Sequence, residues 1–139
     1  MEAEPRRIDV FFYGLFMDEA LLREKDVSPA SRRLASAENF CLLIGARATL
    51  APCANSTVHG VVFSLTHIEV DKLYSEDSVS VYRPEAISLR LGDGSVIPAL
   101  CFNLPEPPAI EERNLEYAAK LRALAERIGL PWDYVSSIQ

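Results

Sequence analysis

The sequence predicts an α+β fold, in which a small mixed or antiparallel, barrel-like sheet is accompanied by a few peripheral helices. Extended apolar segments mostly follow one another instead of alternating with helices, which argues against a doubly wound α/β fold. One long amphipathic pattern lies near the C-terminus. The 139 residues contain no repeat, long linker or low-complexity segment. We therefore expect a single domain over residues 1–139.

The first elements are a strand and a short helix. Residues 8–13 form a nearly continuous apolar run, which predicts a strand that ends at Gly14. Asp18 has the character of an N-cap and predicts a helix over residues 19–25. The next segment, 26–38, is rich in Ser, Ala and charged residues, so we expect a loop.

The middle of the chain predicts more strands. Residues 40–44 are typical of a buried strand, and 47–50 continue it. Residues 52–56 predict a turn. A strong strand follows over 58–65, and Gly60 within it indicates a bulge or a close approach of another backbone.

A second short helix and a polar loop follow. Thr66 and Glu69 have the spacing of a capping box, which predicts a helix that ends near Tyr74. Residues 75–80 are polar and predict a loop.

A hairpin and a long helix complete the fold. The turn Gly92-Asp93-Gly94 joins predicted strands at 81–91 and 95–104. Apolar residues then recur at helical spacing over 110–128, and Gly129 supplies a C-terminal cap. A short helix or turn is expected over 132–138. The apolar positions of the long helix are Leu115, Ala118, Leu121, Leu124, Ala125 and Ile128.

Composition excludes several classes of function. The net charge of −6 argues against nucleic-acid binding, which needs a basic face. An anionic small molecule remains compatible, because a pocket can be locally positive. No apolar run approaches the ~20 residues of a membrane span. Among the three cysteines, Cys41 and Cys101 lie in apolar runs and are expected in the core, and all three, with Cys53, are expected to be structural thiols. This usage fits a reducing compartment, so we expect a cytoplasmic protein.

Common catalytic motifs are missing from the sequence. It has no phosphate-binding loop, dinucleotide fingerprint or nucleophile elbow. His59 and His67 lack the spacing of a metal site and are expected to be structural or exposed. We therefore expect no metal and no other cofactor.

Three local features could together form a site for a carboxylate-bearing small molecule. Backbone N–H groups at the turn over residues 13–17 could bind the carboxylate, with Gly14 permitting its approach, although an ordinary strand-to-helix turn is the alternative. Glu76 could act as a general base, with Asp77 as an equal competitor and a solvated loop acid as the alternative. Tyr117 lies on the long helix, where packing at the edge of the core would also explain it.

The order of these features resembles the γ-glutamylcyclotransferase-like (AIG2-like) family, over about residues 10–134. The matching order is a Tyr-Gly turn, a Val-His-Gly-Val-Val strand, an acid before a Tyr-Arg strand, and a helix with Tyr before Gly-Leu-Pro-x-x-Tyr. In that family the turn usually reads Tyr-Gly-Ser-Asn/Thr-Leu/Met and the catalytic acid is one Glu followed by Gly. Here Leu15 and Phe16 replace the polar pair, and Asp77 replaces that Gly.

The resemblance implies a cyclotransferase without a cofactor. The α-amine of a γ-glutamyl amine or peptide would attack its own γ-carbonyl, giving 5-oxoproline and a free amine or amino acid. The implied base is Glu76. The implied substrate-binding residues are Tyr13, Gly14, Leu15, Phe16, Tyr82 and Tyr117.

Two other hypotheses stay open. The apolar Leu15 and Phe16 fit a non-catalytic protein that binds carboxylate metabolites on the same scaffold. The acidic composition fits an interaction protein without a small ligand. The sequence leaves the oligomeric state and the identity of the released amine open.

Overall fold

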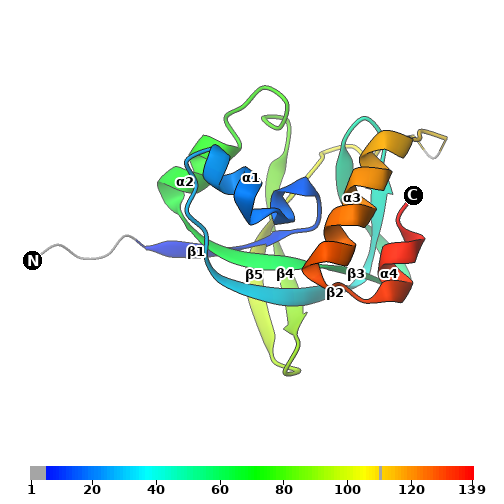
Figure 1. Cartoon of the computed structure of the whole chain (residues 1–139), viewed down its shortest axis with the longest axis horizontal. Coiled ribbons are helices and arrows are strands. Elements are labelled where there is room, and N and C mark those ends of the chain that lie inside the picture. Colours follow the sequence, from blue (N-terminus) through cyan, green and yellow to red (C-terminus); the bar gives the residue numbers. More distant parts are fainter. Residues whose placement is uncertain (1–5, 110) are drawn as a thin grey trace, which may run out of the picture.

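The computed structural model describes residues 6–109 and 111–139, and within them five strands close into a barrel flanked by short helices (Figure 1). The strands are β1 (Arg7–Phe12), β2 (Ala30–Ile44), β3 (Ala48–Thr66), β4 (Arg83–Leu91) and β5 (Val96–Asn103). The helices are the 3₁₀ turn η1 (Leu15–Met17), α1 (Glu19–Glu24), α2 (His67–Leu73), α3 (Leu115–Ile128) and α4 (Trp132–Ser137).

The barrel follows the order β1-β3-β2-β4-β5 and closes where β5 returns to β1. The β1–β5 pair is parallel, with Val10 opposite Leu100, whereas the other four pairs between described strands are antiparallel. The expected mixed, barrel-like sheet with peripheral helices is therefore confirmed. Two of the seams are short, because β1 and β5 pair at two positions and β2 and β4 pair at two positions.

The long β2–β3 hairpin corrects two predictions. Strand β2 begins at Ala30, so most of the expected loop over 26–38 is strand instead. The expected turn over 52–56 lies inside β3, and 48–50 pair back on β2 instead of continuing the strand over 40–44. Register shifts between Ala30 and Arg33 and between Glu38 and Phe40 bend the hairpin and accommodate the polar residues that suggested loops.

Helix caps agree with the sequence more closely than the strand ends do. The Asp18 side chain accepts from the Ala20 N–H at the start of α1. Thr66 and Glu69 form the expected capping box of α2, and Gly129 ends α3 with a φ of 95°. Helix α3 starts at Leu115, which is exposed and not part of the core; the predicted start, residue 110, lies outside the described residues.

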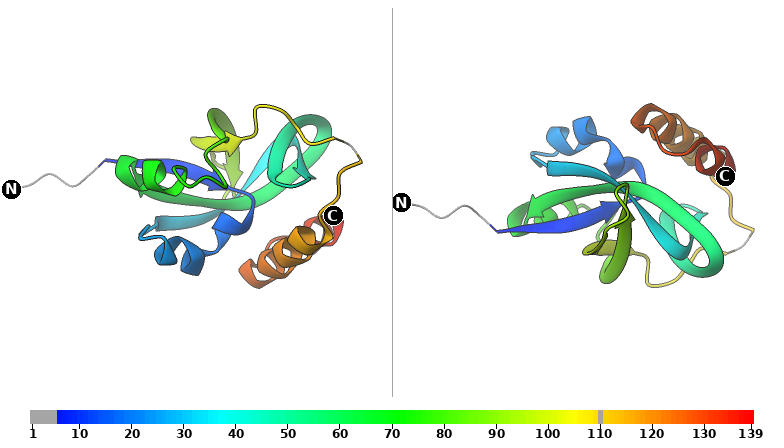
Figure 2. Two further views of the ribbon diagram at one scale, coloured as in Figure 1. Left: turned by 90° about the horizontal axis from the view of Figure 1, so that it is seen from above. Right: turned by 90° about the horizontal axis from the view of Figure 1, so that it is seen from below.

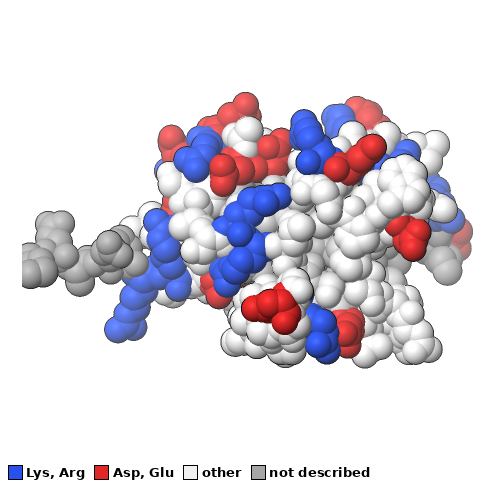
Figure 3. Space-filling view, turned by 60° about the horizontal axis from the view of Figure 1, so that its bottom comes forward, with Lys and Arg blue, Asp and Glu red and all other residues white. Residues whose placement is uncertain are grey.

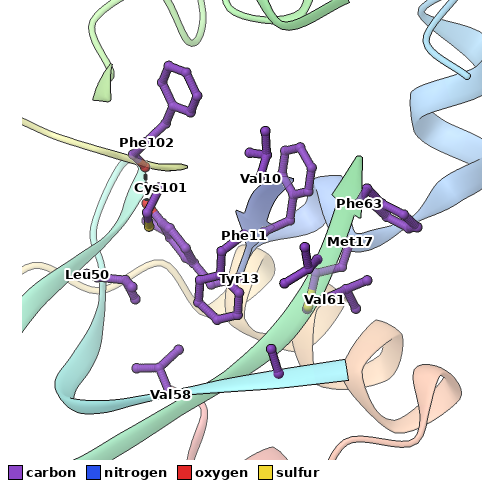
Figure 4. Packing of buried hydrophobic residues seen from close by; sticks show 14 of the residues in the cluster. Val10, Phe11, Tyr13, Met17, Leu50, Val58, Val61, Phe63, Cys101 and Phe102 are labelled. Atoms are coloured by element: carbon purple, nitrogen blue, oxygen red, sulfur yellow. Dashed lines mark hydrogen bonds between the residues drawn. The ribbon is translucent and has the colours of Figure 1, made fainter. Parts of the chain in front are cut away.

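The core fills the barrel with aliphatic and aromatic side chains from all five strands. Figure 4 shows the Tyr13 hydroxyl directed at the Phe102 carbonyl, whereas the Phe63 side chain points to the opposite side of its strand, away from Tyr13. Burial of this kind contributes about 25 cal/mol for each Å² of apolar surface removed from water. The first strand therefore fixes the position of the turn that follows it.

The cysteines divide between core and hairpin. Cys101 is fully buried, as expected, and burial raises the pKa of its thiol to about 12. Cys41 is only half-buried on β2, so its expected place in the core is wrong.

The helices are divided between two sides of the barrel. Figure 2 shows α1 and α3 on one side, with the η1 turn between them, and α2 on the other.

On the face drawn in Figure 3, acidic and basic side chains lie beside one another. No helix over residues 6–109 and 111–139 is long and apolar enough to cross a membrane. In the same residues, no group of three or more His, Cys, Asp and Glu side chains is placed to hold a metal ion.

Candidate active site

A cavity of about 350 Å³ opens where the η1 turn, the loop after α2 and the tip of the β2–β3 hairpin meet. Helix α3 closes one wall through Tyr117. Most side chains that line the cavity are apolar or aromatic, and the charged ones are Lys25, Arg47 and Glu76. The lining residues are Phe11, Phe12, Tyr13, Gly14, Leu15, Phe16, Leu21, Lys25, Ala46, Arg47, Ala48, Tyr74, Glu76, Ser78, Val79, Tyr82, Phe102 and Tyr117.

The structure brings every predicted site residue to this one cavity. They come from distant parts of the chain: the turn after β1, the loop after α2, the start of β4, and α3. They are Tyr13, Gly14, Leu15, Phe16, Glu76, Tyr82 and Tyr117. Of the two competing acids, Glu76 lines the cavity and Asp77 does not. Their roles in binding and catalysis stay predictions.

Glu76 is held by an ion pair that the sequence reading missed. The Lys25 ammonium lies 2.8 Å from each carboxylate oxygen of Glu76. The Lys25 side chain is 25% exposed and that of Glu76 is 42% exposed, so the pair lies at the mouth of the cavity and not in the core. The acid is neither a freely solvated loop residue nor a buried one.

The turn after β1 lines the cavity through Gly14, Leu15 and Phe16. Burial raises the pKa of the Tyr117 hydroxyl, and the nearby Leu15 backbone partly offsets the rise. Asn114 caps α3 by accepting from the Tyr117 N–H at 3.0 Å, which fixes the start of the helix. A Cβ on Gly14 would lie 2.6 Å from the Tyr117 oxygen, so glycine permits this contact.

The hydroxyls of Tyr13 and Tyr82 are already bonded to the main chain. Tyr13 donates to the Phe102 carbonyl at 2.7 Å, and Tyr82 donates to the Ala48 carbonyl. Burial raises the pKa of both hydroxyls above the ordinary value of 10.0, so both keep their protons beyond the pH at which a solvent-exposed tyrosine ionises. Their rings, together with these bonds, give the cavity a rigid wall.

The apolar wall is built around Tyr74. Its ring stacks on Phe102 with centroids 3.9 Å apart and meets Phe16 and Tyr82 edge to face. Such pairs contribute roughly 0.5–1.5 kcal/mol each beyond area burial. Phe16 therefore packs within this aromatic cluster. It stands at the position where the sequence resemblance led us to expect a polar residue.

Lys25, Arg47 and Tyr74 are among the lining residues that sequence reasoning missed. Arg47 lies at the tip of the β2–β3 hairpin, and its Nε donates to the Ser78 carbonyl at 2.7 Å. This bond fixes the loop that carries Glu76. Neither Lys25 nor Arg47 lies next to a motif in the sequence. A correct prediction of the β2–β3 hairpin would have pointed to Arg47, because this residue lies at the hairpin tip.

The two histidines lie outside this cavity. Burial lowers the pKa of His59, and its ring meets Tyr134 with centroids 5.1 Å apart. His67 is the exposed first residue of α2.

The cavity thus combines one carboxylate, from Glu76, with the main chain of the turn over residues 14–16. This combination suits proton transfer on a substrate that carries its own nucleophile.

Solved structures share this architecture. A γ-glutamyl cyclotransferase structure superposes with a TM-score of 0.79 at 16% identity, over 96% of this chain and 89% of that one. The chain has the γ-glutamylcyclotransferase-like fold. Two further structures agree. The uncharacterized protein loc79017 from Homo sapiens has a TM-score of 0.78 at 18% identity, covering 96% of this chain and 89% of that one. An AIG2-like protein from Mus musculus has a TM-score of 0.60 at 17% identity, covering 80% and 90%.

Sequence comparisons add nothing to the structural ones. No family model matches the chain, and no curated protein matches it either. The γ-glutamylcyclotransferase-like fold expected from the order of motifs is thus confirmed by structure, while the reaction is a separate question.

Proposed function

We propose that the chain is a cyclotransferase that converts a γ-glutamyl amine or peptide into 5-oxoproline and a free amine or amino acid. The observation that carries the proposal is that the Glu76 carboxylate and the Gly14–Phe16 turn line the same cavity. A base must lie within reach of the proton it removes, and a substrate carboxylate needs donors on the other side of that ligand. The shared fold with a γ-glutamyl cyclotransferase supports the same reaction.

The proposed reaction needs one base and no external nucleophile. The substrate α-ammonium loses a proton to Glu76, and the resulting amine attacks the γ-carbonyl carbon to form a five-membered ring. The amide C–N bond then breaks, and Glu76 returns that proton to the departing nitrogen. The second proton of the attacking nitrogen passes to the released amine, which leaves a neutral lactam and an ammonium product. Atoms and charges balance without water or cofactor.

Binding would supply much of the rate. The Gly14–Phe16 main chain and the Tyr117 hydroxyl would hold the substrate carboxylate, since hydroxyls both donate and accept. The rigid aromatic wall would keep the glutamyl chain curled, and such orientation can lower a barrier by about 7–11 kcal/mol in the most favourable cases. Arg47 and Lys25 make the charged side of the cavity favourable for an anionic ligand.

The test is turnover by the purified protein. We expect 5-oxoproline from at least one of a panel of γ-glutamyl peptides and γ-glutamyl amines. Glu76→Gln should lower kcat about 10²- to 10⁴-fold, because the amide cannot accept the proton. Asp77→Asn is the matched control and should keep the wild-type rate. A Glu76→Gln protein with the normal rate would remove Glu76 from the mechanism.

A binding protein is the second candidate, and two observations favour it. Lys25 already contacts both oxygens of Glu76, and the Tyr117 hydroxyl already lies against Gly14 in the turn. Thermal-shift measurements with 5-oxoproline and other small carboxylates separate the candidates. Stabilisation without any turnover would favour binding alone.

A further inference from the structure

Lys25 joins two segments that lie 51 residues apart in the chain. It is the residue that ends α1, and its N–H donates to the Leu22 carbonyl at 3.0 Å. Its ammonium spans both oxygens of Glu76 at equal distances of 2.8 Å. The carboxylate is therefore fixed in rotation as well as in position.

The Arg47 Nε bond to the Ser78 carbonyl holds the loop of Glu76, but it does not contact the carboxylate itself. Glu76 lies on the turn-rich segment between α2 and β4, and its neighbours Ser75, Asp77 and Ser78 are exposed. The N–H groups of Val79 and Tyr82 donate to the carbonyls of Glu76 and Val79, so these main-chain bonds shape the loop but do not touch the carboxylate. A flexible side chain of this kind costs about 1.5–2 kcal/mol in lost rotamer freedom when it is ordered.

The pair differs from the ordinary surface ion pairs of the same protein. Lys72 lies 3.9 Å from Asp26, and those side chains are 50% and 88% exposed. Exposed pairs of that kind contribute about 0–1 kcal/mol to stability. The Lys25–Glu76 pair is shorter and less exposed, and both partners line the cavity.

We propose that Lys25 is a positioning residue that holds the Glu76 carboxylate at the cavity in the orientation needed for proton transfer; the inference rests on the proposed function. A carboxylate has about four lone-pair sites, and the ammonium uses one on each oxygen. The remaining sites can accept from a substrate ammonium. That ammonium would then lie near a second positive charge, which disfavours its charged form and favours the free amine that attacks.

The test compares three variants. Lys25→Met removes the charge and keeps much of the volume, Lys25→Arg keeps the charge, and Lys72→Met removes a nearby lysine outside the cavity. The rate of 5-oxoproline release from the best γ-glutamyl substrate gives kcat and KM. We expect Lys25→Met to lower kcat about 10- to 100-fold, as for a misplaced catalytic group, with a smaller change in KM. Lys25→Arg should recover most of the loss, and Lys72→Met should match the wild type.

Two outcomes would overturn the inference. One is a Lys25→Met protein with wild-type kcat. The other is an equal loss of kcat in Lys25→Met and Lys25→Arg, which would mean that the charge on residue 25 does not matter. Thermal unfolding of each variant identifies a protein that has lost its fold. If Lys25→Met does not fold, the kcat of Lys25→Arg decides whether the positive charge at residue 25 is sufficient.

A second measurement does not depend on turnover. Hydrogen exchange of the amides over residues 75–82 should be faster in Lys25→Met than in the wild type or in Lys72→Met. If the wild type converts no γ-glutamyl compound, the proposed function fails, while this comparison still decides whether Lys25 fixes the loop. Unchanged exchange in Lys25→Met would contradict the inference.

Discussion

Tyr117 links helix α3 to the turn after β1. Its hydroxyl lies so close to Gly14 that a Cβ there would come within 2.6 Å of the oxygen, and its own N–H donates to the Asn114 side chain. A substrate carboxylate bound by this turn would meet the same hydroxyl. One side chain therefore shapes the empty site and would contact the ligand in the filled one.

Tyr117→Phe tests this dual role. The change removes one hydrogen bond to a charged group and should lower kcat/KM about 10-fold, which corresponds to about 1.4 kcal/mol. Initial rates of 5-oxoproline release measure the effect. Tyr134→Phe is the matched control, since Tyr134 lies against His59 outside this cavity, and it should leave the rate unchanged. An unaltered kcat/KM in Tyr117→Phe would mean that the hydroxyl plays no part in binding.

Sequence reasoning located the residues that belong to ordered motifs and missed those that act through the fold. The positions of Gly14 and Glu76 follow from the order of strand, turn, helix and loop, and the structure places both at one cavity. Lys25 and Arg47 stand in no motif, and their partners Glu76 and Ser78 are 51 and 31 residues away in the chain. Contacts of this kind depend on the closed barrel, which periodicity alone does not specify.

The β2–β3 hairpin shows the same limit for whole elements. Strand β2 extends over 15 residues and β3 over 19, far longer than the strands expected from the apolar runs within them. The polar stretch over 30–38 lies in a strand because most of it pairs across the hairpin, whereas within 52–56 only Pro52 is paired and the rest falls in the register shift between Glu38 and Phe40. Local composition favours a loop over 30–38, and pairing overrides it. Caps and the Gly92–Gly94 turn were predicted correctly because their chemistry is local.

Gly60 gives this hairpin its close contact with β1. A Cβ at residue 60 would lie 2.3 Å from the Phe12 carbonyl oxygen and 2.8 Å from the Phe11 ring. The expected close backbone approach at Gly60 is thus confirmed. Because the nearest atom belongs to the backbone of a paired strand, the clash cannot be relieved by a side-chain rotation.

We therefore expect Gly60→Ala to lower the free energy of unfolding by about 1–3 kcal/mol, the usual cost of overpacking. Urea denaturation measures the change. Gly92→Ala is the control, because a Cβ there would meet nothing within 4 Å, and its stability should change much less. Equal losses in the two variants would show that the contact with β1 is not the cause.

Across the whole molecule, all five tyrosines are buried or partly buried. In each case burial is the largest cause, and it raises the pKa of the hydroxyl above the ordinary value of 10.0. Four of them line the candidate active site: Tyr13, Tyr74, Tyr82 and Tyr117. The site and the alkaline stability of the fold therefore depend on the same side chains.

The sign of the pH effect follows from these shifts. Unfolded tyrosines ionise near pH 10, whereas the folded ones keep their protons to higher pH, so the unfolded state binds fewer protons above that point. Their contribution to stability is fully present below about pH 10 and is lost as the pH rises further. Each tyrosine can reduce the free energy of unfolding by up to about 1.4 kcal/mol per pH unit.

We expect the free energy of unfolding to fall steeply between about pH 10 and 11 and to vary less with pH just below that range, where the tyrosines stay protonated in both states. Urea denaturation at each pH measures it, and the ultraviolet absorbance of tyrosinate should increase together with unfolding. Tyr13→Phe should be less stable at neutral pH, because the Phe102 carbonyl loses its donor, and its stability should fall less steeply with pH. Ionisation of all the tyrosines near pH 10 in a protein that stays folded would contradict their burial.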